Sequence, residues 1–430
     1  MKYPPNSGGD PTFSRQELAA IIGNRPPSVR ELHDRIRDFS TRFPRLCRLT
    51  KAGKSRLGNE LELLSVSGGP YEIFVIGDPH NDEPVGRATA FALAHQVVTR
   101  AELRADVTWH ILASSDPDGA MLNDRWVTAN ATPTWDSYFR GLYRAALADQ
   151  PEWTFPCPGF NAPLPETQTM MSIIDGFKPG LFEVVSLHNC MAGGAFYITP
   201  NKDARLVDLL ARTAGRWRFT VGSTSIDTVG LESAGPGVYV LDPADRSVPG
   251  AAATDRRPCG ASSIQYAHRH GGLGIAPEVP MWRTRPQVLP ARKRAEALDR
   301  AAETLHDVLD RIRRYQVRAS PFGPAVNDTL AIISGVTAWL RQNPDEPSPH
   351  DSPFKLSARA AGMLLRDIDI QLEAERHPVL LEERDRLDRE LTAWLRGAEE
   401  EFRPVAVSIA QAVGFQLDTI VSSMRLFTGA

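Results

Sequence analysis

Two short segments carry side chains of the types that bind zinc. His80 and Glu83 stand three residues apart just after the apolar run 71–76, and His188 directly follows the apolar run 181–187. Imidazole nitrogens and carboxylate oxygens are common zinc ligands, and a catalytic zinc site needs three of them plus an open position. These residues could therefore hold one zinc ion per chain. Spacing alone leaves open a structural role, with His80 in a turn and His188 at a strand end.

The elements that must position these residues favour an α/β sheet. Apolar runs typical of buried strands lie at 61–66, 71–76, 107–113, 181–187, 195–198 and 275–279. Helical spacing is found over 14–45, with a break at Pro26-Pro27, and over 86–100 and 206–218. Alternating strands and helices predict a sheet covered on both faces. Ligand sites in such sheets lie outside the carboxyl ends of strands, where both histidines stand.

The pattern changes after about residue 290. Two long stretches before it, 114–165 and 241–272, are expected to be loops. After it, amphipathic helical stripes appear at Leu298, Ala301, Leu305, Val308 and Ile312, and again at Leu387, Leu391 and Leu395. We expect a catalytic domain over 1–290 and a C-terminal α-helical domain over 291–430. The stripes most simply form a core, with partner binding or homo-oligomer formation as the alternative.

Composition argues against several kinds of partner. The 430 residues carry 49 Lys+Arg and 52 Asp+Glu without a basic block, so nucleic acid is not an expected partner. No stretch reaches the ~18 apolar residues of a membrane span, and the first residues do not resemble a secretory signal. Cys47, Cys157, Cys190 and Cys259 lack CxxC spacing, which favours reduced thiols in a cytoplasmic protein.

An ordered series of segments between about residues 43 and 280 resembles the zinc metallocarboxypeptidases of the carboxypeptidase A type. The matching segments are Phe43-Pro44 through Gly58-Asn59, Gly77 to Gly86, Asp116-Pro117-Asp118-Gly119, Arg125-Trp126, Leu187-His188-Asn189 and Gly274 to Pro280. The resemblance implies a three-layer α/β/α fold with a mixed twisted sheet, to which the C-terminal helical region is added. It implies that His80, Glu83 and His188 are the zinc ligands. Glu278 is then the catalytic carboxylate, and Arg125 polarises the scissile carbonyl.

The sequence departs from this family on the substrate side. Only Arg144 remains of the Asn-Arg pair with which the family grips a terminal carboxylate. The Asp that orients the first histidine is missing, and Asp78, Asp82 or a backbone carbonyl could replace it. Arg257 lies near the position of the family's mobile tyrosine, and Ile264 is expected to line the specificity pocket. Arginines suit a carboxylate whereas Ile264 suits an apolar group, so these hints conflict; arginines that simply face solvent are the alternative.

These observations together predict a zinc-dependent hydrolase of peptide or amide bonds, either carboxypeptidase-like or amidase-like. Its expected substrate is a specialised peptide or amino-acid conjugate. Zinc lowers the pKa of its water toward ~7, and Glu278 can take that proton and deliver it to the leaving nitrogen. A catalytically silent, carboxypeptidase-like docking protein is the alternative from another class. Cleavage of esters by the same groups also stays open.

Overall fold

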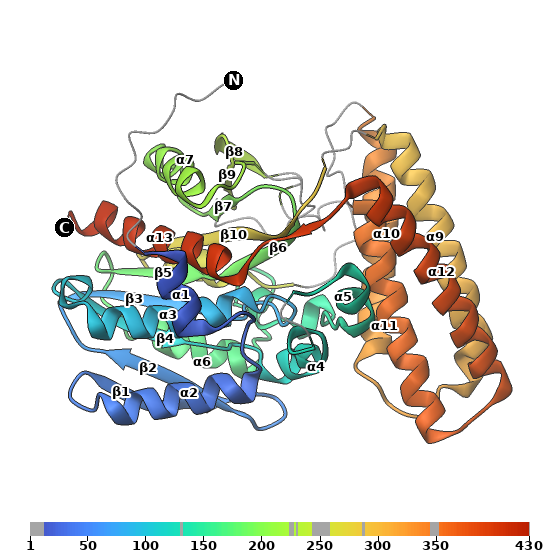
Figure 1. The fold of residues 1–430 in the computed structure, drawn as a ribbon, viewed down its shortest axis with the longest axis horizontal. Coiled ribbons are helices and arrows are strands. Elements are labelled where there is room, and N and C mark those ends of the chain that lie inside the picture. The colour runs from blue at the N-terminus through green and yellow to red at the C-terminus, as the bar shows by residue number, and fades with distance from the viewer. Residues whose placement is uncertain are drawn as a thin grey trace.

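The computed structural model describes residues 13–129, 132–222, 228, 231–242, 259–285, 289–344 and 352–429. A mixed sheet with flanking helices fills one part of the molecule, and long C-terminal helices form a bundle beside it (Figure 1). Figure 1 also shows the last helix leaving this bundle and returning to the sheet.

The strands and helices follow one another along the whole chain. The strands are β1 (Cys47–Lys54), β2 (Glu60–Val66), β3 (Tyr71–Ile76), β4 (Val107–Leu112), β5 (Phe182–Ser186), β6 (His188–Ala192), β7 (Phe196–Thr199), β8 (Glu232–Gly235), β9 (Val238–Val240), β10 (Leu273–Arg283) and β11 (Val405–Ala406). The helices are α1 (Arg15–Ile22), α2 (Val29–Arg42), α3 (Val85–Thr99), α4 (Pro117–Val127), α5 (Trp135–Gly141), α6 (Pro165–Ile174), α7 (Arg205–Trp217), α8 (Ser263–Arg269), α9 (Ala291–Ile312), α10 (Phe322–Gln342), α11 (Ser352–Ala374), α12 (Pro378–Phe402) and α13 (Ile409–Thr428).

The sheet is mixed, with a parallel centre. Its order is β1-β2-β4-β3-β5-β10-β7-β9-β8, and β6 and β11 also pair with β10. Strands β4, β3, β5 and β10 are parallel to one another. Three pairs are antiparallel: β1 with β2, β2 with β4, and β7 with β10. Ile73 and Val75 face one apolar core and Phe74 and Ile76 the other, as strand alternation requires. The predicted α/β/α fold with a mixed sheet and added C-terminal helices is confirmed.

The last helix, α13, belongs to the layer that covers one face of the sheet. It packs against α1, α3, α7 and β10, while α6 and α8 cover the opposite face. Its Gln416 accepts a hydrogen bond from the Thr89 hydroxyl at 2.6 Å and donates one to the His188 carbonyl oxygen at 2.6 Å. The C-terminal segment thus holds the strand that carries a predicted zinc ligand. The domain boundary near residue 290 stays a prediction.

The bundle helices α9 to α12 bury the apolar stripes seen in the sequence. Leu298, Leu305, Leu387 and Leu391 are fully buried, which confirms that the stripes form core. The bundle packs directly on the sheet-containing part, because α11 contacts α5. At Gly362 this contact is so close that an added Cβ would lie 1.9 Å from the Phe139 carbonyl oxygen. Oligomer formation through these helices stays a prediction.

Parts of the predicted loop 114–165 are helical, so that expectation was wrong in detail. Asp116 caps α4 by accepting from the Gly119 amide at 3.1 Å, and Thr134 caps α5 by accepting from the Ser137 amide at 3.1 Å. Both helices are short, so neither shows a long apolar period in the sequence. The caps were the available signal.

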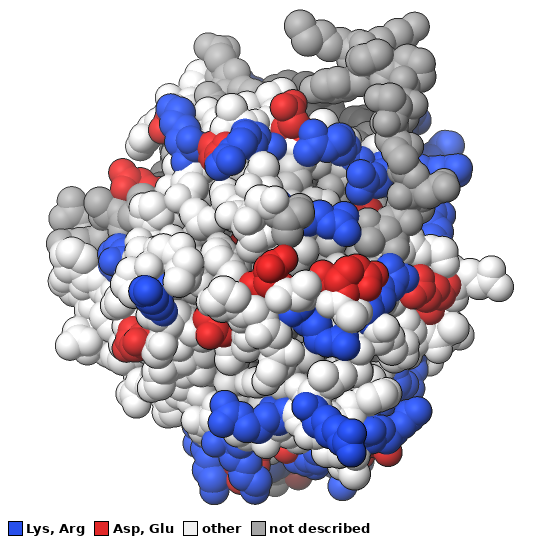
Figure 2. Space-filling view, turned by 90° about the vertical axis from the view of Figure 1, so that its left-hand side faces the viewer, with Lys and Arg blue, Asp and Glu red and all other residues white. Residues whose placement is uncertain are grey.

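Two observations concern the nucleic-acid and membrane partners considered in the sequence analysis: the distribution of surface charge and the hydropathy of the helices. The face in Figure 2 carries both basic and acidic side chains, with the basic ones gathered mainly along its lower edge and in an upper band, and wide uncharged areas lie between the charged groups. Within the described ranges, no helix is both long and apolar enough to cross a membrane.

A buried carboxyl on β5 predicts how stability changes with pH. Burial raises the pKa of Glu183 to about 7 from an ordinary 4.5, although the Ser423 hydroxyl of α13 donates a hydrogen bond to it. The folded state therefore holds a proton that the unfolded chain releases, and stability falls as pH rises from about 4.5 through 7. Because a glutamine side chain cannot ionise, Glu183→Gln should raise the free energy of unfolding by about 2–3 kcal/mol more at pH 8 than at pH 5.

Urea denaturation at the two pH values measures this difference. Glu102→Gln, at an exposed position, is the matched control and should show no such pH dependence. An equal effect of Glu183→Gln at both pH values would contradict the assignment of a neutral carboxyl.

Candidate metal centre

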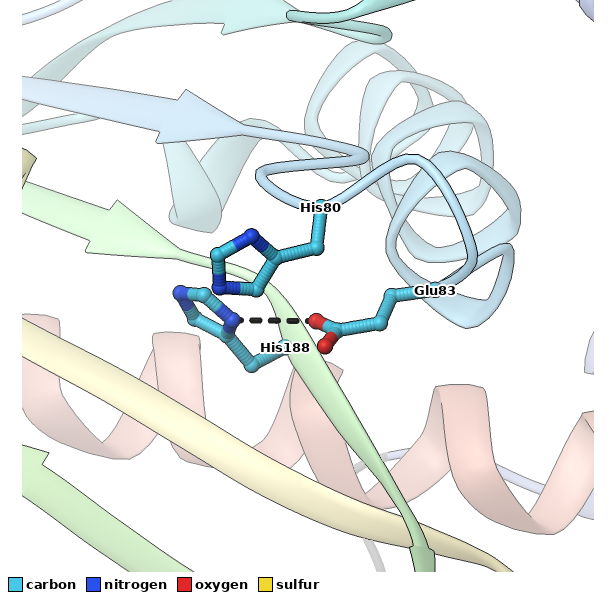
Figure 3. A group of neighbouring side chains, drawn as sticks. All are labelled: His80, Glu83 and His188. Carbon is cyan, nitrogen blue, oxygen red and sulfur yellow. Dashed lines mark hydrogen bonds and ion pairs between the residues drawn. The ribbon is translucent and has the colours of Figure 1, made fainter. Parts of the chain in front are cut away.

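The loop between β3 and α3 presents the first two candidate ligands. Its backbone is tightly fixed, because a Cβ on Gly77 would lie 2.3 Å from the Ala113 carbonyl oxygen and one on Gly86 would lie 2.5 Å from that of Leu187. Asp78 takes a positive φ of 47°, a conformation unusual for a residue with a side chain. Its buried carboxylate accepts from Arg87 at 2.8 Å and from Ser114 at 2.9 Å, which stabilises this turn. The turn directs His80 and Glu83, which follow Asp78, toward the start of β6 (Figure 3).

His80 and Glu83 from this loop converge with His188, the first residue of β6 (Figure 3). Each offers a ligand atom, and these atoms all lie within 4.8 Å of one another. His188 Nδ1 lies 3.0 Å from Glu83 Oε2, which also accepts from the Asn189 amide at 3.2 Å. All three residues are buried. The structure therefore brings together the three residues that the sequence proposed as a metal site.

Charges around the two histidines set their protonation. Burial and the positive charges of Arg144 and His188 hold the pKa of His80 well below its usual value. Burial alone would lower the pKa of His188 as well, but the charge and hydrogen bond of Glu83 raise it to about 9. The carboxylates of Glu83, Glu278 and Glu152 thus favour a positive charge at this point.

Glu278 lies beside the third candidate ligand. Strands β6 and β10 pair in parallel with His188 opposite Glu278, and Glu278 Oε1 is 3.9 Å from His188 Nδ1. The register of the sheet therefore places a buried carboxylate next to the candidate metal position. Proton transfer to or from a reacting group requires such proximity.

A second buried carboxylate, Glu152, lies on the other side of His188. It accepts from the Ser263 hydroxyl at 2.8 Å, and its Oε1 is 4.0 Å from His188 Nε2. Burial raises its pKa to about 7. Ser186 Oγ, at 3.1 Å from His188 Nε2, is the nearer partner that can fix the orientation of the ring.

These residues line one cavity of about 90 Å³. Sheet-side residues form its floor, and side chains from α10 and α11 of the bundle complete its wall. Its lining includes His80, Glu83, Arg144, Glu152, Trp153, His188, Ile198, Ile264, Glu278, Asp328 and Arg359. The cavity combines charged groups with apolar ones, as small-molecule sites commonly do.

Of the other residues that the sequence proposed for the site, two line this cavity, one does not, and one lies outside the described residues. Ile264 and Arg144 line the cavity, and Arg144 Nη1 donates to Asp82 at 2.6 Å and to Glu83 at 3.0 Å. Arg125 does not line it. It is exposed on α4, because its neighbour Trp126 turns inward, so the structure does not support contact of Arg125 with a substrate carbonyl. Arg257 lies outside the described residues.

The two aspartates that could replace the missing orienting Asp are both paired with arginines. Asp78 accepts from Arg87, and Asp82 accepts from Arg144. His80 Nδ1 is buried, and it has no hydrogen-bond partner within the part of the chain that the structure describes. Since an unpartnered buried polar atom is costly, this ring has a nitrogen available for coordination.

The donor set fits zinc. Two imidazoles and one carboxylate are a known ligand set of catalytic zinc, and the cavity beside them leaves room for a further ligand. His80, Glu83 and His188 would hold the ion, with Ser186 and Asn189 as supporting residues.

Several residues of the site carried no usable sequence signal. Glu152 lies in a single 3₁₀ turn, Pro151–Trp153, and Asp328 and Arg359 belong to helices far along the chain from the proposed ligands. Their places follow from how α10 and α11 dock, which no local pattern encodes. Asp82 was named from the sequence as a possible partner of His80, whereas the structure pairs it with Arg144.

Comparisons with known proteins agree with this site. The sequence profile of the zinc carboxypeptidase family matches residues 32–190. Carboxypeptidase SOL1 of Arabidopsis thaliana is 32% identical over 108 residues, which are 22% of this chain and 22% of that protein.

Among solved structures, carboxypeptidase A from Helicoverpa armigera aligns over 82% of this chain and 76% of its own, with 15% identity and a TM-score of 0.41. A metallo-carboxypeptidase from Burkholderia cenocepacia aligns over 59% and 60%, with 14% identity and a TM-score of 0.37. The sequence match covers His80, Glu83 and His188 and ends before Glu278. Residues 32–190 are thus similar to the zinc carboxypeptidase family, and the chain spans about a fifth of the length of the curated relative it matches.

Proposed function

We propose that this protein is a zinc-dependent hydrolase of peptide or amide bonds that acts on a small peptide or amino-acid conjugate. One observation carries the proposal: the His80, Glu83 and His188 ligand atoms converge within 4.8 Å, and the register of β6 and β10 sets Glu278 beside them. A zinc site with a purely structural role would have no need of an adjacent buried carboxylate in an accessible cavity.

Each group of the site has its own role in the proposed hydrolysis. A zinc ion held by the three ligands supplies Lewis acidity, which polarises a carbonyl and lowers the pKa of water toward ~7. Glu278 takes a proton from the attacking water and later gives it to the leaving nitrogen. Arg144, whose guanidinium bonds the ligand Glu83, stands in the cavity where a positive charge can stabilise developing negative charge. In this proposal Arg144 replaces Arg125 in that role.

Removal and return of the metal test the proposed function. Protein stripped with a chelator should hydrolyse N-acyl amino acids and dipeptides at least ~100-fold more slowly than protein reloaded with one equivalent of zinc, since the ion supplies several kcal/mol of transition-state stabilisation. Released amine is measured for each substrate. Hydrolysis that survives chelation would contradict a zinc mechanism. Zinc-loaded protein that hydrolyses none of the substrates would favour the silent docking protein.

A further inference from the structure

One buried side chain of the C-terminal helix contacts all three elements that carry the candidate metal centre. Gln416 of α13 is fully buried, and its side-chain oxygen accepts a hydrogen bond from the Thr89 hydroxyl of α3 at 2.6 Å. Its Nε2 donates to the His188 carbonyl oxygen at 2.6 Å and to the Pro277 carbonyl oxygen at 3.4 Å. A single amide group therefore connects the helix that follows the zinc-binding loop, the start of β6 and the peptide bond before Glu278.

The backbone pairing of β10 with its neighbours is interrupted at this point. β10 pairs with β5 up to Ile275 and with β6 from Glu278 onward. Between these stretches lies Pro277, which has no amide hydrogen to donate. The amide of Leu187, between β5 and β6, donates to β3 and not to β10. Ladder bonds between β6 and β10 therefore hold the His188–Glu278 pair from one side only, and the amide of α13 bridges the other side.

The surroundings of this amide are apolar. Val413, Leu417 and Ile420 of the same helix are fully buried in one apolar core. An apolar side chain of similar length, such as methionine, would serve packing alone. A buried polar group whose donors and acceptor are satisfied fixes its partners in one arrangement. The amide of Gln416 thus contributes the relative position of the elements that it joins.

The helix that carries this amide is itself firmly held. Trp217 of α7 donates its Nε1 hydrogen to the buried Asp418 at 2.7 Å. The same indole ring packs so closely on α13 that a Cβ on Gly414 would lie 2.1 Å from it. Gln416 therefore reaches the site from a rigid support.

We propose that Gln416 is a positioning residue, which sets Glu278 against the metal ligand His188 and so gives the C-terminal helix control over the geometry of the site. This inference rests on the proposed function. Both side chains project from the two strands that the amide bridges, so a shift between the strands changes their separation. Proton transfer requires hydrogen-bond reach, and a misplacement of about 1 Å can cost ~100-fold in rate.

Gln416→Met tests this role, because it removes the amide and keeps a side chain of similar length. In the zinc-loaded full-length protein, kcat should fall by about 10–100-fold and KM should change less than about 3-fold, since the reacting groups are displaced and substrate contacts are not. Hydrogen exchange of the metal-free protein, followed by mass spectrometry, should become at least ~10-fold faster for the amides of residues 188–192 and 278–283.

Gln411→Met is the matched control. Gln411 is also a buried glutamine of α13, but it donates to the carbonyl oxygen of Trp217, which does not line the cavity. The two variants should lose similar stability toward urea. Only Gln416→Met should change kcat and the exchange of β6 and β10.

Two results would overturn the positioning role. One is an equal effect of the two variants on kcat and on exchange, because the amide would then serve stability alone. The other is faster exchange in Gln416→Met without a fall in kcat, because the strands would then move without consequence for the reaction. If the wild type hydrolyses no substrate, the proposed function fails, and exchange in the metal-free protein still decides whether Gln416 holds the two strands together.

Discussion

Replacing Glu278 by glutamine is expected to lower kcat by about 10²–10⁴-fold while one zinc ion per chain stays bound. The substitution keeps the shape of the side chain and removes its ability to exchange a proton. Glu278 is not among the three converging ligand atoms, although its carboxylate lies only 3.9 Å from His188 Nδ1. Loss of turnover should therefore occur without loss of metal. KM should change little, because Glu278 is expected to act in the transition state and not in substrate binding.

Steady-state kinetics on the substrates cleaved by the wild type, together with elemental analysis, measure both quantities. Glu232→Gln, an exposed strand residue, is the matched control and should keep full activity. The main alternative to Glu278 as the catalytic carboxylate is Glu152, since it is buried in the same cavity and burial raises its pKa to about 7. If Glu152→Gln abolished turnover and Glu278→Gln did not, the two carboxylates would have to exchange roles.

The sequence was most informative where local pattern and chemistry coincide. The HxxE segment and His188 each follow a strand, and the sheet register then brings them together with Glu278. Strand alternation and leucine stripes likewise predicted the sheet and the helical region. These features depend on residues close in the chain or on the shared ends of parallel strands, so a linear pattern encodes them.

The sequence was least informative where distant segments pack on one another. Arg125 follows a recognisable motif, yet the turn of α4 that buries Trp126 leaves it on the surface. Arg359 and Asp328 reach the cavity only because α10 and α11 dock beside the segment after α5. Gln416, near the end of the chain, fixes the backbone of His188. None of these placements follows from spacing, because each depends on tertiary packing between segments far apart in the chain.

The role of His188 predicts the second large effect. His188→Ala should lower zinc affinity by at least ~100-fold, since changes to residues that merely support a ligand already cost 10–100-fold. The loss removes one of three donors and also leaves Glu83 without its 3.0 Å contact to the ring. Zinc should then no longer stabilise the fold: the wild type gains about 4 kcal/mol at a zinc concentration 1,000 times Kd, and the variant gains far less.

Elemental analysis and thermal unfolding with and without zinc distinguish this effect from simple misfolding. The metal-free proteins should melt at similar temperatures, apart from the modest loss of packing at one buried ring, and zinc should raise the melting temperature of the wild type alone. His306→Ala, an exposed change on α9 where the ring bonds only its own helix at 2.8 Å, is the matched control and should bind zinc normally. Zinc bound equally well by His188→Ala would mean that the metal is held elsewhere. Because Glu278 is paired with His188 through the sheet register, the proposed acid–base role would then lose its geometric basis as well.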